Sequence, residues 1–443
     1  MIRRLSKFPR FLGFNNTAVL PFGGDLATHL LSWLSMTATA ALLVDWGQRR
    51  GASTAGHWAA ALYVGSPLVA YLAGTAYVEP LLTLFATAAL ALLDAWGRCR
   101  ELRAILPAAL LAGACASTKY HGLFVAAAVA AALAWAAMRE GQWRQAALGG
   151  AVLAAVVALP YGRILLWTGN PLFPFLSSIF GASEWMQNPH EPVAERLVGW
   201  LRAPFDAVFV RGRVGGEPPI SPAYLLALPL IVLVGSRWSR AVLAMTALYA
   251  ALLPLHVRYL MPLAPVLALA AASDAAGDRR IAWLARGRWR GLVTVLLLLP
   301  SLVWAAHRLV RLGPLPASVE MRECFLAERV PGFDGLAFLN RAHGARYTVY
   351  AAHAEHLHDY ARGRFLGDWS GPHAFAKILG APTSEALHAR LSQAGAEYLL
   401  VPAVPPVPAV EALARRGDQF REVFRSDTAT VYAVVGERRA SDR

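Results

Sequence analysis

Long apolar runs are the feature of this chain that most restricts its fold. Examples are LATHLLSWLSMTATAALLV (26–44), EPLLTLFATAALALLDAW (79–96) and GLVTVLLLLPSLVWAA (291–306). At about 1.5 Å per residue, helices of this length cross most of a ~30 Å hydrocarbon core. Only 16% of the residues are charged, whereas soluble domains have about 25%. A water-soluble core cannot bury so much apolar surface, and the sequence therefore predicts a polytopic membrane protein.

The predicted fold class is mainly α, with about ten transmembrane helices and a small C-terminal extracytoplasmic α/β domain. We predict a membrane domain over 1–310, with an outer juxtamembrane loop at 168–220, and the α/β domain over 311–443. The predicted spans are 26–45, 57–74, 79–97, 104–119, 121–138, 146–167, 221–236, 240–256, 258–274 and 291–308.

The distribution of arginine predicts the orientation. All but three of the 42 basic residues are arginine, and many lie in alternate short loops, as in Arg49–Arg50 and Arg279–Arg280. The positive-inside rule makes these loops cytoplasmic and the tail external, in a multi-pass protein of the cytoplasmic membrane. Such charges are topology signals, which argues against nucleic acid as a partner. This orientation puts the basic start MIRRLSKFPR outside. We therefore expect an odd number of missing upstream spans; a genuinely external terminus is the alternative.

Two segments outside the spans have recognisable patterns. In 193–210, Val193, Leu197, Leu201 and Phe205 recur every four residues, as in a helix that lies in the membrane interface, which Pro204 would interrupt. The tail alternates like a small α/β domain: RYTVYA, EYLLVP and ATVYAVV are predicted strands, and SEALHARLSQAGA is a predicted helix capped by Ser384, with Gly395 near its end.

The histidine-rich segment HAEHLHDY has two open interpretations. Its composition fits an exposed helix, but His353, His356 and His358, with His373 further along, are also a candidate metal set. No strict HExxH spacing is present, so the spacing gives the metal reading little support. The three cysteines lie far apart and have no metal-ligand spacing.

Polar residues at membrane depth gather on the predicted outer side. These are Tyr77 and Glu79, the turn Ser117–His121 with Lys119 and Tyr120, then Arg163, and finally His256, Arg258 and Tyr259. Buried polar groups are costly in a bilayer and are therefore candidates for function. A carboxylate can act as a base or ion ligand, and lysine with arginines suits a phosphate. For each residue alone a structural role stays open: Glu79 as a helix N-terminal carboxylate, Lys119 and Arg258 as snorkelling anchors.

These motifs together resemble a known family. The segment PYGRILLWTGNPLFPFLSSIFG (160–181) is similar to an outer loop of bacterial GT-C glycosyltransferases, the superfamily of protein O-mannosyltransferases and lipid A aminoarabinose transferases. AYVEPLLTLFATAALALL resembles their second acidic motif, ASTKYHGLF their Lys-Tyr turn, and RYLMPLAPVLALAA a late Arg-aromatic segment. The resemblance covers most of residues 25–310, and its most specific part is the loop with Asn170, Pro171, Phe173 and Pro174.

The resemblance implies transfer of a sugar from a polyprenyl-phosphate donor to a glycan, lipid or protein acceptor on the outer face. It makes Glu79 a supporting acidic residue. Lys119, Tyr120, Arg163, His256 and Arg258 become candidates for binding the donor phosphate or substrate. The prolines of the loop are expected to hold Phe173 and Phe175 at the bilayer surface. A divalent metal is an open alternative.

The chain departs from the family at its start. The family's first span and first outer loop, with its principal acidic base, have no counterpart, and Asp25 is interpreted as a helix cap. If the chain is complete, the resemblance implies an inactive protein. The rival functions are a membrane transporter or flippase, and a surface-polysaccharide polymerase or ligase. Against transport, no internal repeat is visible, and the polar residues lie at span ends.

Overall fold

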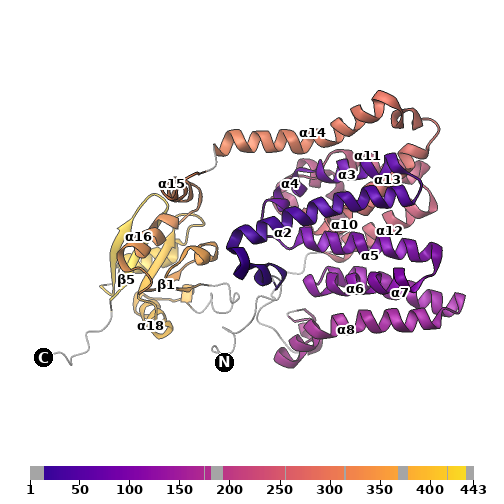
Figure 1. Cartoon of the computed structure of the whole chain (residues 1–443). Coiled ribbons are helices and arrows are strands. Elements are labelled where there is room, and N and C mark those ends of the chain that lie inside the picture. The colour runs from indigo at the N-terminus through magenta and orange to yellow at the C-terminus, as the bar shows by residue number, and fades with distance from the viewer. Residues whose placement is uncertain are drawn as a thin grey trace. The chain divides into compact units, whose positions relative to one another are not determined.

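A computed structural model of the chain describes residues 14–173, 175–180, 193–254, 256–313, 316–367, 378–416 and 418–435. The chain divides into two compact units (Figure 1). The helical unit contains the described residues of 14–173 and 193–313. The C-terminal unit contains those of 175–180 and 316–435.

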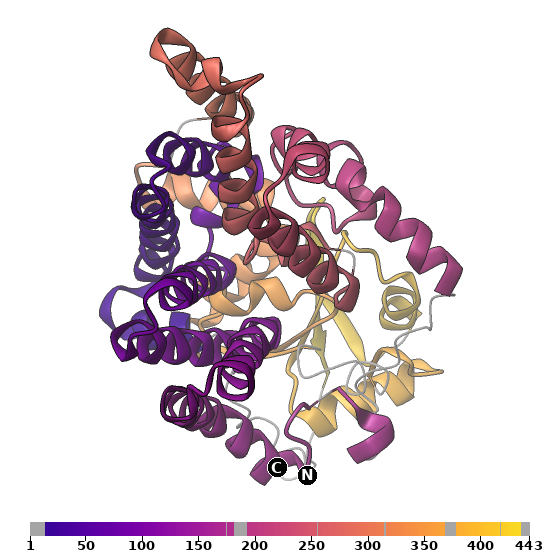
Figure 2. The same ribbon diagram turned by 90° about the vertical axis from the view of Figure 1, so that its right-hand side faces the viewer.

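The helical unit is built from helices joined by short connections. Its elements are α2 (Phe14–Arg49), α3 (Ser53–Val64), α4 (Pro67–Ala73), α5 (Glu79–Cys99), α6 (Leu102–Thr118), α7 (Gly122–Glu140), α8 (Trp143–Thr168), α10 (Val193–Phe209), η2 (Arg211–Arg213), α11 (Ala223–Val234), α12 (Arg237–Leu252), η3 (Val257–Leu260), α13 (Ala264–Gly277), η4 (Ala282–Ala285) and α14 (Gly287–Leu312). Consecutive long helices pack side by side: α2 contacts α5, α5 contacts α6, and α6 contacts α7 and α8, a row that Figure 2 shows from indigo to magenta.

Five helices in the described part of the chain are long and apolar enough to cross a membrane. They are Leu26–Arg49 within α2, and α5, α7, α8 and α14. The apolar helices α6, α11 and α13 are shorter. A mainly helical membrane architecture with a small C-terminal sheet is confirmed, whereas the total of ten spans stays a prediction.

Two predicted spans are interrupted. The segment 57–74 forms α3 and α4, separated at Gly65–Ser66. A Cβ at Gly65 would lie 1.8 Å from the carbonyl oxygen of Leu297 in α14, so this glycine allows close backbone packing. The segment 258–274 becomes α-helical only at Ala264, after η3 and Pro262, which lacks the N–H group of a helix interior; Pro265 is tolerated in the first turn of α13.

Two predicted features near the helix ends are also wrong. Asp25 lies well inside α2 and is therefore not an N-cap residue. Pro204 does not interrupt the juxtamembrane helix, since α10 continues through it to Phe209. The predicted apolar stripe of α10 is exposed at two of its positions: Leu201 is 84% exposed and Phe205 is 55% exposed.

The C-terminal unit contains a five-stranded sheet of order β2-β1-β3-β5-β4. Its elements are α9 (Ser177–Phe180), α15 (Val319–Arg329), α16 (Phe333–His343), β1 (Thr348–Ala351), η5 (Glu355–Tyr360), β2 (Arg364–Leu366), α18 (Ser384–Ala394), β3 (Tyr398–Pro402), α19 (Pro408–Arg416), β4 (Phe420–Arg425) and β5 (Ala429–Val434). Strand β1 pairs in parallel with β2 and β3, whereas β5 is antiparallel to β3 and β4.

The three predicted strands correspond to β1, β3 and β5, and β2 and β4 were not predicted. The predicted helix forms as α18, but Thr383 caps it, accepting a hydrogen bond from the Ala386 N–H at 3.2 Å, while Ser384 is already helical. Gly395 ends the helix with φ +76°. Residues 355–360 form the 3-10 helix η5.

Candidate functional site

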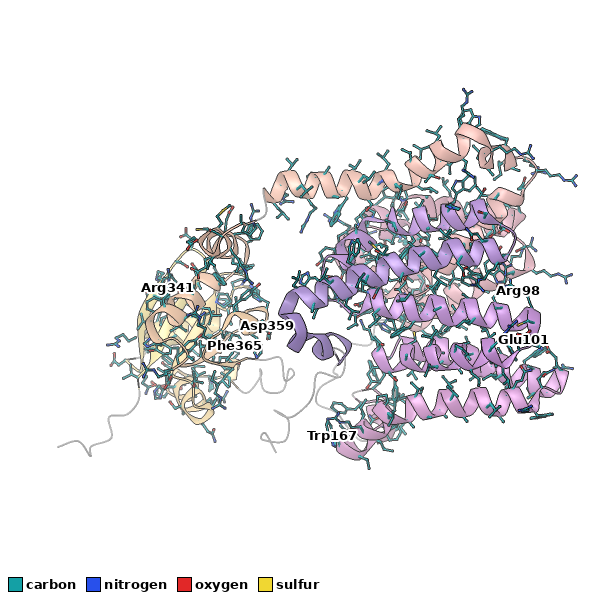
Figure 3. The ribbon with its side chains drawn as sticks, viewed as in Figure 1. Arg98, Glu101, Trp167, Arg341, Asp359 and Phe365 are labelled. Atoms are coloured by element: carbon teal, nitrogen blue, oxygen red, sulfur yellow. The ribbon has the colours of Figure 1, made fainter. Side chains whose placement is uncertain are left out.

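The predicted site residues lie at the same end of the helical unit because of where their helices begin and end. Glu79 begins α5, Lys119 directly follows α6, and Arg258 lies in η3 before α13. The opposite end of α5 carries Arg98, and Glu101 follows it; Figure 3 shows both at one end of the helical unit and Trp167 at the other.

Lys119 and Arg258 both pair with Glu79. The Lys119 Nζ donates a hydrogen bond to Glu79 Oε1 at 2.7 Å, and Arg258 Nε lies 3.6 Å from the same oxygen. The Glu79 side chain is only 1% exposed. A carboxylate so buried is stable as an ion only beside cations, which here come from two other elements. The three residues therefore lie together in the structure, while their roles stay predictions.

Glu217 joins this cluster, although sequence reasoning missed it. It lies in the loop between η2 and α11, 11% exposed, with Oε1 at 3.4 Å from Arg258 Nη1 and Oε2 at 3.0 Å from His256 Nδ1. The local signal that could have found it is GGEPP, a lone carboxylate after two glycines in an otherwise apolar and basic loop. We call Glu79, Lys119, Glu217, His256 and Arg258 the charge cluster.

Aromatic rings line the charge cluster. The ring of Tyr259 lies 4.8 Å from Lys119 Nζ, and its centroid lies 4.2 Å from that of His121 and 4.9 Å from that of His256.

The TGNP segment ends α8 with a defined turn. Gly169 adopts φ +74° as the C-cap, and the buried Asn170 accepts a hydrogen bond from the Leu172 N–H at 2.9 Å through Oδ1. This is an Asx turn, which asparagine favours because its side chain replaces a backbone acceptor. The Tyr120 hydroxyl donates to the Phe173 carbonyl, and this bond joins the Lys-Tyr turn to the loop. Pro171 is described, whereas Pro174 lies outside the described residues.

Arg163 lies apart from these contacts. Its guanidinium carbon is 4.0 Å from the ring centroid of Trp167 on the same helix, and no ion pair joins it to the charge cluster among the described residues. The structure therefore gives Arg163 a stacking contact at the end of α8.

An apolar groove of about 570 Å³ begins beside the charge cluster. Elements α10, α11, α12, η3 and α13 form its walls, and lining residues include Trp200, Tyr224, Leu228, Leu243, His256 and Tyr259. His256 and Tyr259 belong to both the groove and the cluster contacts. An elongated apolar chain in the groove could thus carry a charged group into the cluster.

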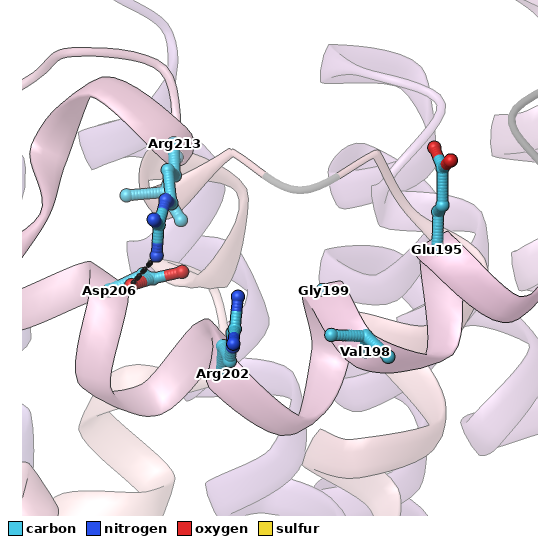
Figure 4. A pocket seen from close by; sticks show the side chains of 7 residues that line it. Glu195, Val198, Gly199, Arg202, Asp206 and Arg213 are labelled. Atoms are coloured by element: carbon cyan, nitrogen blue, oxygen red, sulfur yellow. Dashed lines mark ion pairs between the residues drawn. The ribbon is translucent and has the colours of Figure 1, made fainter.

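A second hollow, of about 360 Å³, lies along α10 and η2. Its side chains carry both signs of charge, and those of Arg202, Asp206 and Arg213 point toward one another (Figure 4). Arg213 Nη1 lies 3.5 Å from the nearly buried Asp206. Glu195 adds a second carboxylate, so opposite charges balance within this hollow.

The described residues contain no group of three or more histidine, cysteine, aspartate or glutamate side chains that could hold a metal ion. In the charge cluster, the Arg258 guanidinium bridges the two carboxylates, at the place where a divalent ion shared by them would bind. These residues therefore do not fit a metal centre. In the tail, His356 Nε2 contacts the Pro331 carbonyl and His358 contacts Asp359; His373 lies outside the described residues.

Comparison with solved structures identifies the architecture. The crystal structure of ArnT from Cupriavidus metallidurans in the apo state matches with a TM-score of 0.58 and 16% identity, over 96% of this chain and 87% of that one. The chain has the fold of ArnT. The undecaprenyl-phosphate-bound form of the same protein matches with a TM-score of 0.56 and 16% identity, over 96% of this chain and 88% of that one. Arabinofuranosyltransferase AftD from Mycobacteria matches with a TM-score of 0.49 and 16% identity, over 95% of this chain and 36% of that one.

Sequence comparisons give less. A family model described as "SF2091/S2213" matches residues 321–433, within the C-terminal unit. No curated protein matches the chain in sequence. The two ArnT structures are 16% identical to this chain, so the likeness shows a shared fold.

Proposed function

We propose that this protein is an integral-membrane glycosyltransferase. It would move a sugar from a polyprenyl-phosphate donor to an acceptor at the outer face of the cytoplasmic membrane. The observation that carries the proposal is the convergence of Lys119 and Arg258 beside an apolar groove. The fold supports it, since the ArnT structure that shares this architecture was also solved with undecaprenyl phosphate.

Each part of the site has a role in this proposal. The groove takes the polyprenyl chain, because burying an apolar chain there removes it from water at the membrane surface. Lys119 and Arg258 hold the donor phosphate and stabilise the charge that develops on its oxygen as the sugar departs. Glu79 keeps the two cations at this end of the bundle. Tyr259 lies between the groove and the charge cluster and contacts both.

The test is binding of undecaprenyl phosphate to the full chain in detergent. Lys119→Met and Arg258→Gln should each weaken binding at least about tenfold, because each removes a charge-assisted contact. Arg279→Gln, which removes an exposed arginine elsewhere in the helical unit, should bind like the wild type. Unchanged affinity in both cluster variants would contradict the proposal.

Transfer itself is measured with undecaprenyl-phosphate-linked pentoses and hexoses in proteoliposomes. A glycosyltransferase releases undecaprenyl phosphate and labels an acceptor. A transporter or flippase would instead move the intact lipid between leaflets without breaking its sugar bond. The same assay with lipid, glycan and peptide acceptors would separate transfer to a single acceptor from polymerisation or ligation of a surface polysaccharide.

A further inference from the structure

We propose that His256, positioned by Glu217, accepts the proton of the acceptor hydroxyl. This inference rests on the proposed glycosyl transfer and names its base within this chain. Glu217 Oε2 lies 3.0 Å from His256 Nδ1, so the carboxylate faces the Nδ1 side of the ring, leaves Nε2 for the acceptor, and can stabilise the imidazolium that forms when the proton is taken up. His256 also lines the apolar groove and therefore reaches the space proposed for the donor.

The surrounding backbone is shaped for this imidazole. Gly215 has φ +98°, and a Cβ there would lie 2.2 Å from His256 Cε1 and 2.4 Å from Nε2. The ring therefore lies directly against the glycine backbone, with the Tyr259 ring at a centroid distance of 4.9 Å. The Val257 N–H donates to the Val214 carbonyl at 2.9 Å, which joins the Glu217 loop to the His256 segment. Two segments about 40 residues apart in sequence thus form one unit.

The charges of the cluster explain how donor binding would prepare the base. Glu79 and Glu217 carry two negative charges, and Lys119 and Arg258 carry two positive ones. The cluster is thus neutral without ligand, and Glu217 is the more accessible of the two anions, at 11% against 1% exposure. A donor phosphate would compete with Glu217 for Arg258. Glu217 would then stay beside His256, where its carboxylate can stabilise the imidazolium once His256 has accepted the proton.

The reaction balances with these groups alone. The acceptor oxygen forms a bond to the anomeric carbon of the sugar while the bond from that carbon to the phosphate oxygen breaks. The bonding electrons leave with the phosphate, which Lys119 and Arg258 stabilise. The hydroxyl proton passes to His256 Nε2, and Glu217 stabilises the resulting imidazolium. The products are the glycosylated acceptor, polyprenyl phosphate and a proton, which His256 releases to solvent.

The experiment compares Glu217→Gln with the wild type in two measurements on the full chain. Binding of undecaprenyl phosphate should become roughly fivefold tighter, because the competing anion is gone. Turnover with an undecaprenyl-phosphate-linked sugar should fall at least about 100-fold in kcat, and the acidic limb of the pH profile should move, since His256 loses its carboxylate. Glu217→Asp should restore part of kcat. Glu101→Gln, which removes a carboxylate at the opposite end of the bundle, is the matched control.

The possible results separate the inference from the proposed function. Weaker or unchanged binding by Glu217→Gln, or an unchanged kcat, would overturn the role of Glu217 while the wild type still binds and transfers. Loss of kcat in Glu217→Gln together with an unchanged kcat in His256→Gln would exclude His256 as the base. A wild type that does not bind undecaprenyl phosphate would overturn both.

Discussion

At the scale of single residues, the charge cluster shows how a few side chains from distant segments acquire a joint chemistry. Glu79 and Lys119 are helix-end residues whose polarity at membrane depth is visible in the sequence. Their hydrogen bond at 2.7 Å is not visible there, and neither is the approach of Glu217 to Arg258. Glu217 was missed because its value as a partner depends on a loop that folds back onto η3.

Gly215 offers the sharpest residue-scale prediction. Gly215→Ala should destabilise the helical unit by about 2 kcal/mol, because the added Cβ meets the His256 ring and the residue keeps a positive φ. Gly216→Ala is the control: Gly216 has φ +77°, but a Cβ there meets nothing within 4 Å. Thermal unfolding of the two variants in detergent measures the difference between their losses of stability, which reports the contact of the added Cβ with the His256 ring. Equal losses in both variants would contradict the close ring contact.

At the scale of helices, Asp94 joins α2 and α5 at the end opposite the charge cluster. Trp46 Nε1 donates to Asp94 Oδ2 at 2.8 Å, and Arg50 and Arg98 pair with the same carboxylate at 2.6 and 2.8 Å. The Arg50 guanidinium also lies 3.9 Å from the Trp238 ring centroid of α12. The arginines that serve as topology signals in the sequence therefore also connect helices.

Asp94→Asn should consequently lower the stability of the helical unit by about 2 kcal/mol, because the partly buried Arg50 and the exposed Arg98 lose their shared counter-ion. Asp45→Asn removes only an exposed pair with Arg49 on the same helix and should cost less than about 0.5 kcal/mol. Thermal melts in detergent at low and moderate salt distinguish the two. A loss for Asp94→Asn no larger than for Asp45→Asn would show that this junction contributes little.

Sequence periodicity is not sufficient to predict the boundaries of these helices and strands. Pro67 marks the break between α3 and α4 in the sequence, but the close approach of Gly65 to the Leu297 carbonyl of α14, more than 200 residues away, is not contained in any local pattern. Similarly, β2 has only three residues, and in β4 the residues after the buried Phe420 are largely exposed. Short or weakly patterned strands become strands through their neighbours in the sheet.

At the scale of the whole molecule, the native cysteines provide a test of orientation. Cys99 is exposed at the end of α5 opposite the charge cluster, Cys324 is exposed in the C-terminal unit, and Cys115 is buried. With the arginine-rich loops inside, a membrane-impermeant maleimide should label Cys324 in intact cells. It should label Cys99 only after permeabilisation, and Cys115 only after denaturation.

Variants that each lack one cysteine, with labelling measured as a mass shift, show which cysteine reacts. Cys324→Ser should abolish labelling of intact cells, while Cys99→Ser should leave it unchanged. Labelling of Cys99 but not Cys324 in intact cells would invert the proposed orientation. It would also place the charge cluster on the cytoplasmic side, which would contradict transfer at the outer face.

The sequence by itself determined the class of this protein: apolar runs of membrane length, helices that begin and end at polar residues, and a small α/β tail. These properties are local, because burial in lipid depends on the composition of each segment. Only the tertiary structure decided which helix ends and loops lie next to one another. Glu79, Lys119, Glu217 and Arg258 are separated by about 40 to 180 residues and become one neutral cluster only when α5, α6, the 214–217 loop and η3 pack together. Pairing of charges depends on distances of a few ångströms in space, which sequence spacing does not encode.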